Sequence, residues 1–153
     1  MTRIKCGFDN TPQVFGRDLL VTWGPTLFVN IGFDPNFNPQ YQIQIPVPGI
    51  TDVQALVDTG ALESCIDSML AAQLNLPIVD RRLISGVGGG HIVNIHLAQV
   101  HVPALGQTAY GAFAAVHLAA GGQVHRALIG RTFLQLFTMI YEGRTGTVTI
   151  HNE

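Results

Sequence analysis

The sequence predicts an all-β fold with one or two short helices, and three observations support this prediction. The 153-residue chain is long enough for one ordinary domain and too short for two independent hydrophobic cores. Hydrophobic residues make up 47% of it, with 17 glycines and 8 prolines, which is typical of a globular chain and excludes a disordered or collagen-like one. The apolar residues occur in short alternating or β-branched runs separated by Gly, Pro, Asn and Asp, the pattern of β-strands joined by turns.

The alternating runs predict eight strands along the chain. These strands cover residues 26–33, 53–58, 78–85, 91–102, 108–118, 124–129, 138–141 and 147–151. Between the first two, prolines surround a short alternating piece at residues 41–45, which indicates a long, stiff excursion. The Glu-Gly-Arg-Thr-Gly segment after Tyr141 has turn chemistry, so the last two strands are predicted to form a hairpin.

Two stretches are predicted to be helical. Asp67 or Ser68 can cap a helix that runs to Leu74 and is stopped by Pro77. The second predicted helix covers residues 131–137, directly after Gly130. Residues 1–25 have the weakest pattern, and we expect them to form an N-terminal extension, as an arm, an extra strand pair or a partly ordered tail, in front of a domain covering residues 26–153.

Charge and hydropathy exclude several classes of partner. Eight Lys and Arg residues against ten Asp and Glu residues, with no basic run, argue against nucleic-acid binding. The longest nearly apolar stretch, residues 111–122, is shorter than the roughly twenty residues of a membrane helix. The charged residues at the start of the chain are not followed by the apolar core of a signal peptide. We therefore expect a cytoplasmic protein. Only 12% of the residues are charged, about half the usual share, which predicts that another subunit covers part of the surface.

Cysteine and histidine spacing does not indicate a metal site or a cofactor. Cys6 and Cys65 lie far apart, so we expect both to be reduced packing residues. The six histidines show no recurring ligand spacing, and His96 and His101, five residues apart on one predicted strand, point to opposite faces. We therefore expect solvated or hydrogen-bonded surface histidines and no bound metal.

The strongest chemical signal is the segment Ala-Leu-Val-Asp-Thr-Gly-Ala at residues 55–61. An apolar strand runs directly into Asp58 and then into a turn of small residues. A carboxylate at a strand end, beside backbone N–H groups and a small hydroxyl, is well placed to accept a proton from water. Taken alone, the tripeptide also fits an ordinary turn in which the aspartate accepts local hydrogen bonds.

Two further motifs follow in order. Residues 81–93 form a strand, a glycine-rich tip and a returning strand, and residues 127–131 place apolar side chains before Gly130 and a short helix. The glycine-rich tip could be interpreted as a phosphate cradle, but no helix start with Lys and Ser or Thr follows it. The alternation after the tip instead indicates a β-hairpin.

In this order the three motifs resemble those of the retropepsins, the single-lobe aspartic peptidases of retroviruses and their cellular relatives. Residues 79–82 and 96–100 and the terminal hairpin especially resemble the retroviral-type domain of eukaryotic DNA-damage-inducible proteins. The resemblance covers about residues 26–150. It implies a retropepsin-like acid-protease fold and a homodimer with one active site on its two-fold axis, to which each chain contributes Asp58.

The resemblance also implies the roles of the site residues. Thr59 would form a hydrogen bond across the axis, Gly60 would let the substrate backbone approach closely, and the hairpin would close as a flap over a substrate bound in extended conformation. The implied site residues are the catalytic Asp58; the active-site loop residues Thr59, Gly60 and Ala61; the flap residues Ile84, Ser85, Gly86, Val87, Gly88, Gly89, Gly90 and His91; and the supporting residues Leu128, Ile129, Gly130 and Arg131.

Chain length supports the dimer independently, because one Asp-Thr-Gly in a single-domain chain requires a second copy to supply a facing carboxylate. The predicted activity is peptide-bond hydrolysis by a water that the two Asp58 carboxylates activate. A dimeric peptide-binding module without turnover is the alternative that the sequence leaves open.

One position departs from the retroviral pattern. The acid that typically pairs with the arginine of the Gly-Arg motif is replaced by Leu62 in this chain. Because an unpaired buried guanidinium is costly, we expect Glu63 or an acid of the other subunit to pair with Arg131. Leu62 also removes a polar group from the expected substrate cleft, which favours apolar substrate side chains nearby.

Overall fold

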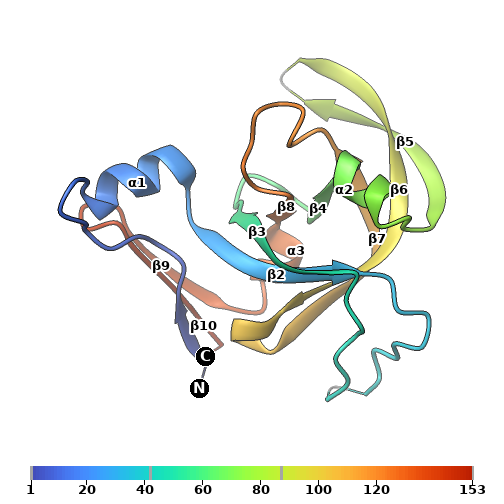
Figure 1. Ribbon diagram of the computed structural model, residues 1–153, viewed down its shortest axis with the longest axis horizontal. Helices are drawn as coiled ribbons and strands as arrows, with labels where there is room; N and C mark the ends of the chain where they lie inside the picture. The colour runs from blue at the N-terminus through green and yellow to red at the C-terminus, as the bar shows by residue number, and fades with distance from the viewer. Residues whose placement is uncertain (1, 42, 87, 153) are drawn as a thin grey trace.

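The computed structural model describes residues 2–41, 43–86 and 88–152 and shows a mostly-β fold with few, short helices (Figure 1). The strands are β1 (Arg3–Lys5), β2 (Thr26–Gly32), β3 (Ile50–Val57), β4 (Cys65–Asp67), β5 (Ile78–Gly86), β6 (Gly89–Val102), β7 (Gln107–Val116), β8 (Ala127–Ile129), β9 (Thr138–Glu142) and β10 (Thr147–His151). The helices are α1 (Gly16–Trp23), α2 (Ser68–Gln73), the single 3₁₀ turn η1 (Pro103–Leu105) and α3 (Arg131–Leu134). The predicted all-β fold class is confirmed, with three short α-helices and a 3₁₀ turn among the described residues where one or two helices were predicted.

The strands form two sheets. The smaller sheet has the order β1-β10-β9, and the larger has the order β2-β3-β8-β4-β7-β6-β5. An additional pairing between β2 and β6 closes six strands of the larger sheet into a barrel, and β5 stays outside it. The predicted C-terminal hairpin is present as β9 and β10, and β1 pairs with β10 at its other edge.

The core fills the barrel and the space between it and the small sheet. Alternate residues of each barrel strand point inward, as the period of two in the sequence predicts. Val29, Ala55 and Ile129 are fully buried inside the barrel. Val148 and Ile150 of β10 belong to the same apolar cluster, so the two sheets share one core.

Two parallel pairings position the candidate site. β3 pairs with β8, with Val57 opposite Ile129, and β4 pairs with β7. Because parallel strands end at the same edge, the residues that follow β3 and β8 come together there. Residues about 70 positions apart in sequence, at Asp58 and Gly130, therefore lie side by side.

Several sequence predictions differ from the structure in extent. The strand predicted at residues 124–129 is limited to β8, because residues 117–126 fold into turns around the buried Asp67. The helix predicted at residues 131–137 ends at Leu134, and the alternating piece at residues 41–45 forms no strand in its described part. Of the forms expected for residues 1–25, the structure shows one strand, β1, paired with β10, together with the helix α1, which was not predicted. β4 was not predicted either, because it has only three residues and pairs with strands far away in the chain. No helix in the described part of the chain is long and apolar enough to cross a bilayer.

Candidate active site

The carboxylate of Asp58 is presented at the end of β3 in a tight turn. The N–H of Asp58 donates to the Ile129 carbonyl at 2.9 Å, so β8 holds the start of the turn. Asp58 Oδ1 accepts the N–H of Gly60 at 2.9 Å, and the Asp58 carbonyl accepts the N–H of Ala61 at 3.2 Å. Asp58 is half-buried, whereas Thr59 and Gly60 are exposed. The turn thus fixes a carboxylate at the surface of the chain.

The segment after β8 supports this turn from behind. Arg131 donates its backbone N–H to the Ala61 carbonyl at 2.9 Å and its Nη1 to the Thr59 carbonyl at 2.8 Å. The N–H of Gly130 donates to Ser64 Oγ at 3.0 Å. The structure therefore brings residues 58–61 together with residues 128–131.

The expected pairing of Arg131 with Glu63 within the chain is wrong. Among the described residues, ion pairs join Arg82 to Asp80 and Arg126 to Asp67, and Arg131 takes part in neither. Arg131 is exposed, so water can solvate its guanidinium and no buried acid is required. A carbonyl oxygen of the active-site turn is its partner instead. An acid of a second subunit stays a prediction.

Gly130 occupies a position with no room for a side chain, and this leads to a stability prediction. A methyl group there would lie 2.5 Å from the Glu63 carbonyl carbon and 2.6 Å from its oxygen. We expect Gly130→Ala to lower the free energy of unfolding by about 1–3 kcal/mol, because the backbone around the turn must shift. Urea unfolding would measure this, with Gly88→Ala as the control, because no atom lies within 4 Å of a methyl group there. Equal stability of the two variants would contradict the packing argument.

The Asp58 turn keeps unused polar groups within the described residues. No hydrogen bond joins Asp58 to a second carboxylate in the part of the chain that the structure describes, and the exposed Thr59 hydroxyl has no partner there. Burial raises the pKa of the Cys65 thiol, and the negative charges of Glu63 and then Asp58 raise it further. Cys65 is not among the site residues that the sequence predicts. The only signal for it was its position seven residues after Asp58.

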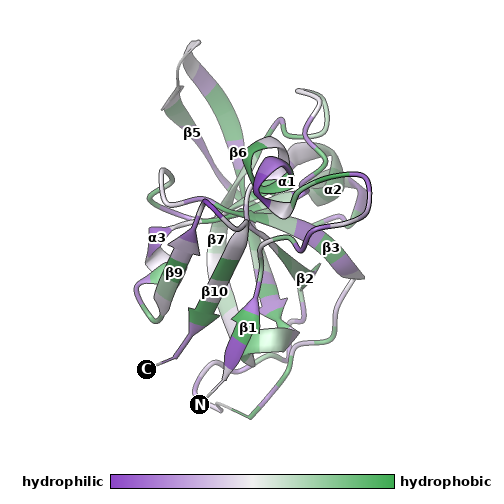
Figure 2. Cartoon of the chain, turned by 90° about the vertical axis from the view of Figure 1, so that its left-hand side faces the viewer, coloured by the Kyte–Doolittle hydropathy of each residue, from purple (hydrophilic) through white to green (hydrophobic). Residues whose placement is uncertain are grey.

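The predicted hairpin is present as β5 and β6. Ile84 pairs with His91, and Ser85 pairs with Gly90. Gly89 at the tip has a φ of +103°, a conformation that favours glycine. Val87 lies outside the described residues. Figure 2 shows the hairpin extending away from the rest of the fold. No hydrogen bond or ion pair connects the described part of its tip with residues 58–61.

The expectation of surface histidines is wrong for three of the six. His96, His101 and His125 are buried. Each has a hydrogen bond: His96 Nδ1 with the Leu76 carbonyl at 2.9 Å, His101 Nδ1 with the Thr108 hydroxyl at 2.8 Å, and His125 Nε2 with the Thr26 hydroxyl at 2.8 Å. The second half of β6 is covered on both faces, which buries His96 and His101 together.

Burial lowers the pKa of His101 and His125, which favours their neutral form. In the described ranges, no group of three or more His, Cys, Asp or Glu side chains is arranged to hold a metal ion. Cys6 and Cys65 are free cysteines, as expected, and Cys6 is buried. These residues contribute packing and hydrogen bonds rather than a recognisable ligand set.

Comparison with protein families identifies a similarity. A family model described as gag-polyprotein putative aspartyl protease matches residues 43–136. The matched region contains the Asp58 turn, the β5–β6 hairpin and the segment at residues 128–131. No curated protein matches the chain.

Proposed function

This chain belongs to the gag-polyprotein putative aspartyl protease family, and we propose that it is an aspartic endopeptidase whose active site is shared by two copies of the chain. The observation that carries the proposal is the exposed turn at the end of β3, where Asp58 accepts the N–H of Gly60 and Thr59 has an unused hydroxyl within the described residues. A single chain of this length offers one such carboxylate, so a C2 dimer is the simplest arrangement that brings two together.

The proposed mechanism uses the two Asp58 side chains as acid and base. Two carboxylates a few Å apart cannot both be ionised without a large cost, so the pair would hold one proton. The ionised carboxylate removes a proton from a water molecule, and the resulting hydroxide attacks the peptide carbonyl carbon. The protonated carboxyl donates to the carbonyl oxygen as negative charge develops on it. When the C–N bond breaks, the carboxyl that took the water proton donates it to the amine nitrogen, and the other carboxylate takes a proton from a hydroxyl of the tetrahedral intermediate, so the pair again holds one proton.

The substrate would be a peptide in extended conformation. The β5–β6 hairpin offers main-chain donors and acceptors that could pair with such a peptide by β-augmentation. The glycines at its tip give the backbone freedom to open and close. Leu62 is 63% exposed beside the active-site turn, which supports a preference for apolar substrate side chains near it.

A mixed peptide library and a dilution series test this proposal together. We expect cleavage between mildly acidic and neutral pH, and a fall in activity per chain when the protein is diluted below the dissociation constant of the dimer. Sedimentation velocity at the same concentrations would measure the dimer directly. Binding of peptides without any cleavage would support a silent binding module instead. Activity per chain that does not change while the dimer dissociates would refute the shared site.

A further inference from the structure

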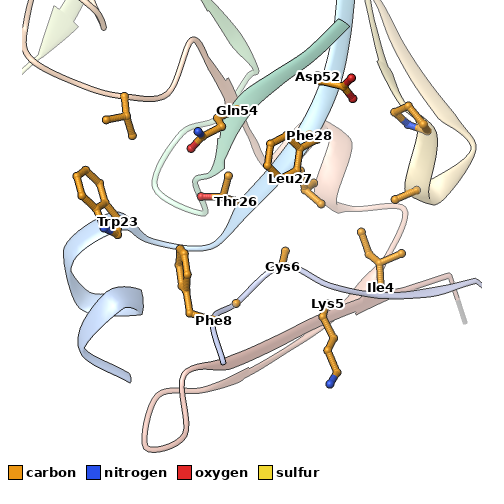
Figure 3. A pocket seen from close by; sticks show the side chains of 14 residues that line it. Ile4, Lys5, Cys6, Phe8, Trp23, Thr26, Leu27, Phe28, Asp52 and Gln54 are labelled. Carbon is orange, nitrogen blue, oxygen red and sulfur yellow. The ribbon is translucent and has the colours of Figure 1, made fainter. Parts of the chain in front are cut away.

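A cavity of about 620 Å³ lies between the two sheets, apart from the Asp58 turn (Figure 3). β1 lies along one side of it and β2 along the other. At one end the two chain segments meet, where the N–H of Thr26 donates to the Cys6 carbonyl at 2.8 Å. Beyond that contact the sheets separate and leave the cavity. Its volume is typical of ligand pockets.

The β2 side of the cavity is an open strand edge. The N–H of Val57 donates to the Pro25 carbonyl, so these two residues form a hydrogen-bonded pair of the antiparallel β2–β3 ladder. Hydrogen-bonded and non-hydrogen-bonded pairs alternate along such a ladder, so Thr26 and Phe28 both occupy non-hydrogen-bonded positions. Like the N–H of Thr26, the N–H and carbonyl of Phe28 therefore point away from β3. Two residues further on, Asn30 pairs with His101 of β6. Within the described ranges, no backbone partner exists for Phe28 on this edge.

The β1 side is a second open edge. The N–H of Cys6 donates to Val148 at 2.9 Å, so Lys5, opposite Thr149, points its own N–H and carbonyl away from β10. These groups also have no backbone partner in the described part of the chain. Figure 3 shows the Lys5 side chain turned away from the aromatic rings of the cavity. A strand placed in the cavity could thus pair on both sides.

The side chains of the cavity favour an apolar occupant with one positive charge. Phe8, Trp23 and Phe28 line it, and Figure 3 shows Asp52 at the end away from Trp23. Asp52 has a φ of +57°, and the β2 strand opposite it changes register between Val29 and Ile31. Local distortions of this kind change the direction in which a side chain points. The Asp52 carboxylate forms no ion pair among the described residues. A basic side chain would complement it.

We propose that this cavity binds an extended peptide strand with apolar side chains and a basic residue beside Asp52. The peptide would pair with Lys5 on one side and Phe28 on the other, joining the two sheets through one added strand. The site is separate from Asp58 and does not depend on peptidase activity.

The chain's one tryptophan, Trp23, lines the cavity and reports on binding. The probe is acetyl-Val-Thr-Val-Thr-Lys-amide, titrated against the Asp58→Asn protein so that it is not cleaved. We expect a saturable change in Trp23 fluorescence and slower hydrogen exchange of the Lys5 and Phe28 amides. With Asp52→Asn added, affinity should fall about fivefold, the size expected for a partly exposed ion pair.

Two matched probes distinguish a strand from other occupants. Replacing the lysine of the probe with glutamate should weaken binding, and methylating its alternate backbone nitrogens should abolish it. Equal binding of the methylated probe, or of the glutamate probe, would overturn the proposal. So would exchange protection confined to the β5–β6 hairpin, which would place the peptide in the catalytic cleft. If Trp23 fluorescence instead changed with protein concentration in the absence of peptide, a second copy of the chain would be the occupant of the cavity, and the peptide proposal would be overturned.

Discussion

Replacing Asp58 with Asn is expected to abolish peptide hydrolysis and leave the fold intact. A carboxamide cannot remove a proton from water, and in the dimer both copies of the base are lost, so we expect kcat/KM to fall by about 10⁴-fold, the upper end of the contribution of a general base. The fold should survive, because the carboxamide oxygen can still accept the Gly60 N–H that Asp58 Oδ1 accepts now. Cleavage assays on a peptide selected from the library, together with thermal unfolding, would measure both effects.

Asp9→Asn is the matched control for this variant, because it makes the same chemical change at an exposed position in the N-terminal segment, away from the Asp58 turn. It should cleave as the wild type does. Mixing subunits adds a sharper test. With a ninefold excess of the Asp58→Asn chain, only about a tenth of the wild-type chains pair with each other. Because the proposed site needs Asp58 from both chains, activity should fall about tenfold. Undiminished activity in the mixture would show that one chain is sufficient, and cleavage by the variant itself would remove Asp58 from the mechanism.

Asp67→Ala is expected to cause the largest loss of stability that we predict. The Asp67 carboxylate is fully buried and accepts the N–H groups of Leu70 at 3.1 Å, Leu118 at 3.1 Å and Ala119 at 3.0 Å. It also pairs with Arg126 Nε at 3.2 Å. Its removal leaves three backbone donors and a guanidinium without an acceptor, which should lower the free energy of unfolding by about 3–5 kcal/mol. Urea unfolding would measure the loss.

The control for Asp67 is Asp80→Ala, because Asp80 pairs with Arg82 at 3.1 Å while both side chains are more than half exposed. That variant should lose less than about 1 kcal/mol. Similar losses at the two positions would contradict the assigned importance of burial.

Asp67 also makes stability depend on pH. Burial alone would raise the pKa of its carboxyl, but the N–H donors of Ala119, Leu70 and Leu118 and the charge of Arg126 outweigh burial and lower the pKa from its ordinary value of 3.8. The stability that this carboxylate contributes is therefore complete above pH 3.8 and is lost as pH falls further. The difference in unfolding free energy between wild type and Asp67→Asn should shrink below that pH. A constant difference would contradict the assigned ionisation.

Local patterns in the sequence were sufficient for much of the fold and for the outline of the site. The period-two runs predicted most strands, the glycine-rich tip predicted the β5–β6 hairpin, and Asp67 or Ser68 was predicted as a helix cap. These features depend on neighbours within a few residues, and the structure contains each of them: Asp67 Oδ2 accepts the N–H of Leu70 at the start of α2. The prominence of Asp58 was also visible, because an apolar strand leads straight into it.

The sequence by itself determined the kind of fold and the position of the turn that carries Asp58, because these follow from short-range periodicity and turn chemistry. Only the tertiary structure decided that Arg131 donates to Thr59 rather than to Glu63, that Asp67 organises a distant loop, and that His96 and His101 are buried. It also decided the open strand edges at Lys5 and Phe28. Each of these outcomes depends on which distant segments pack together, and local spacing along the chain carries no information about that packing.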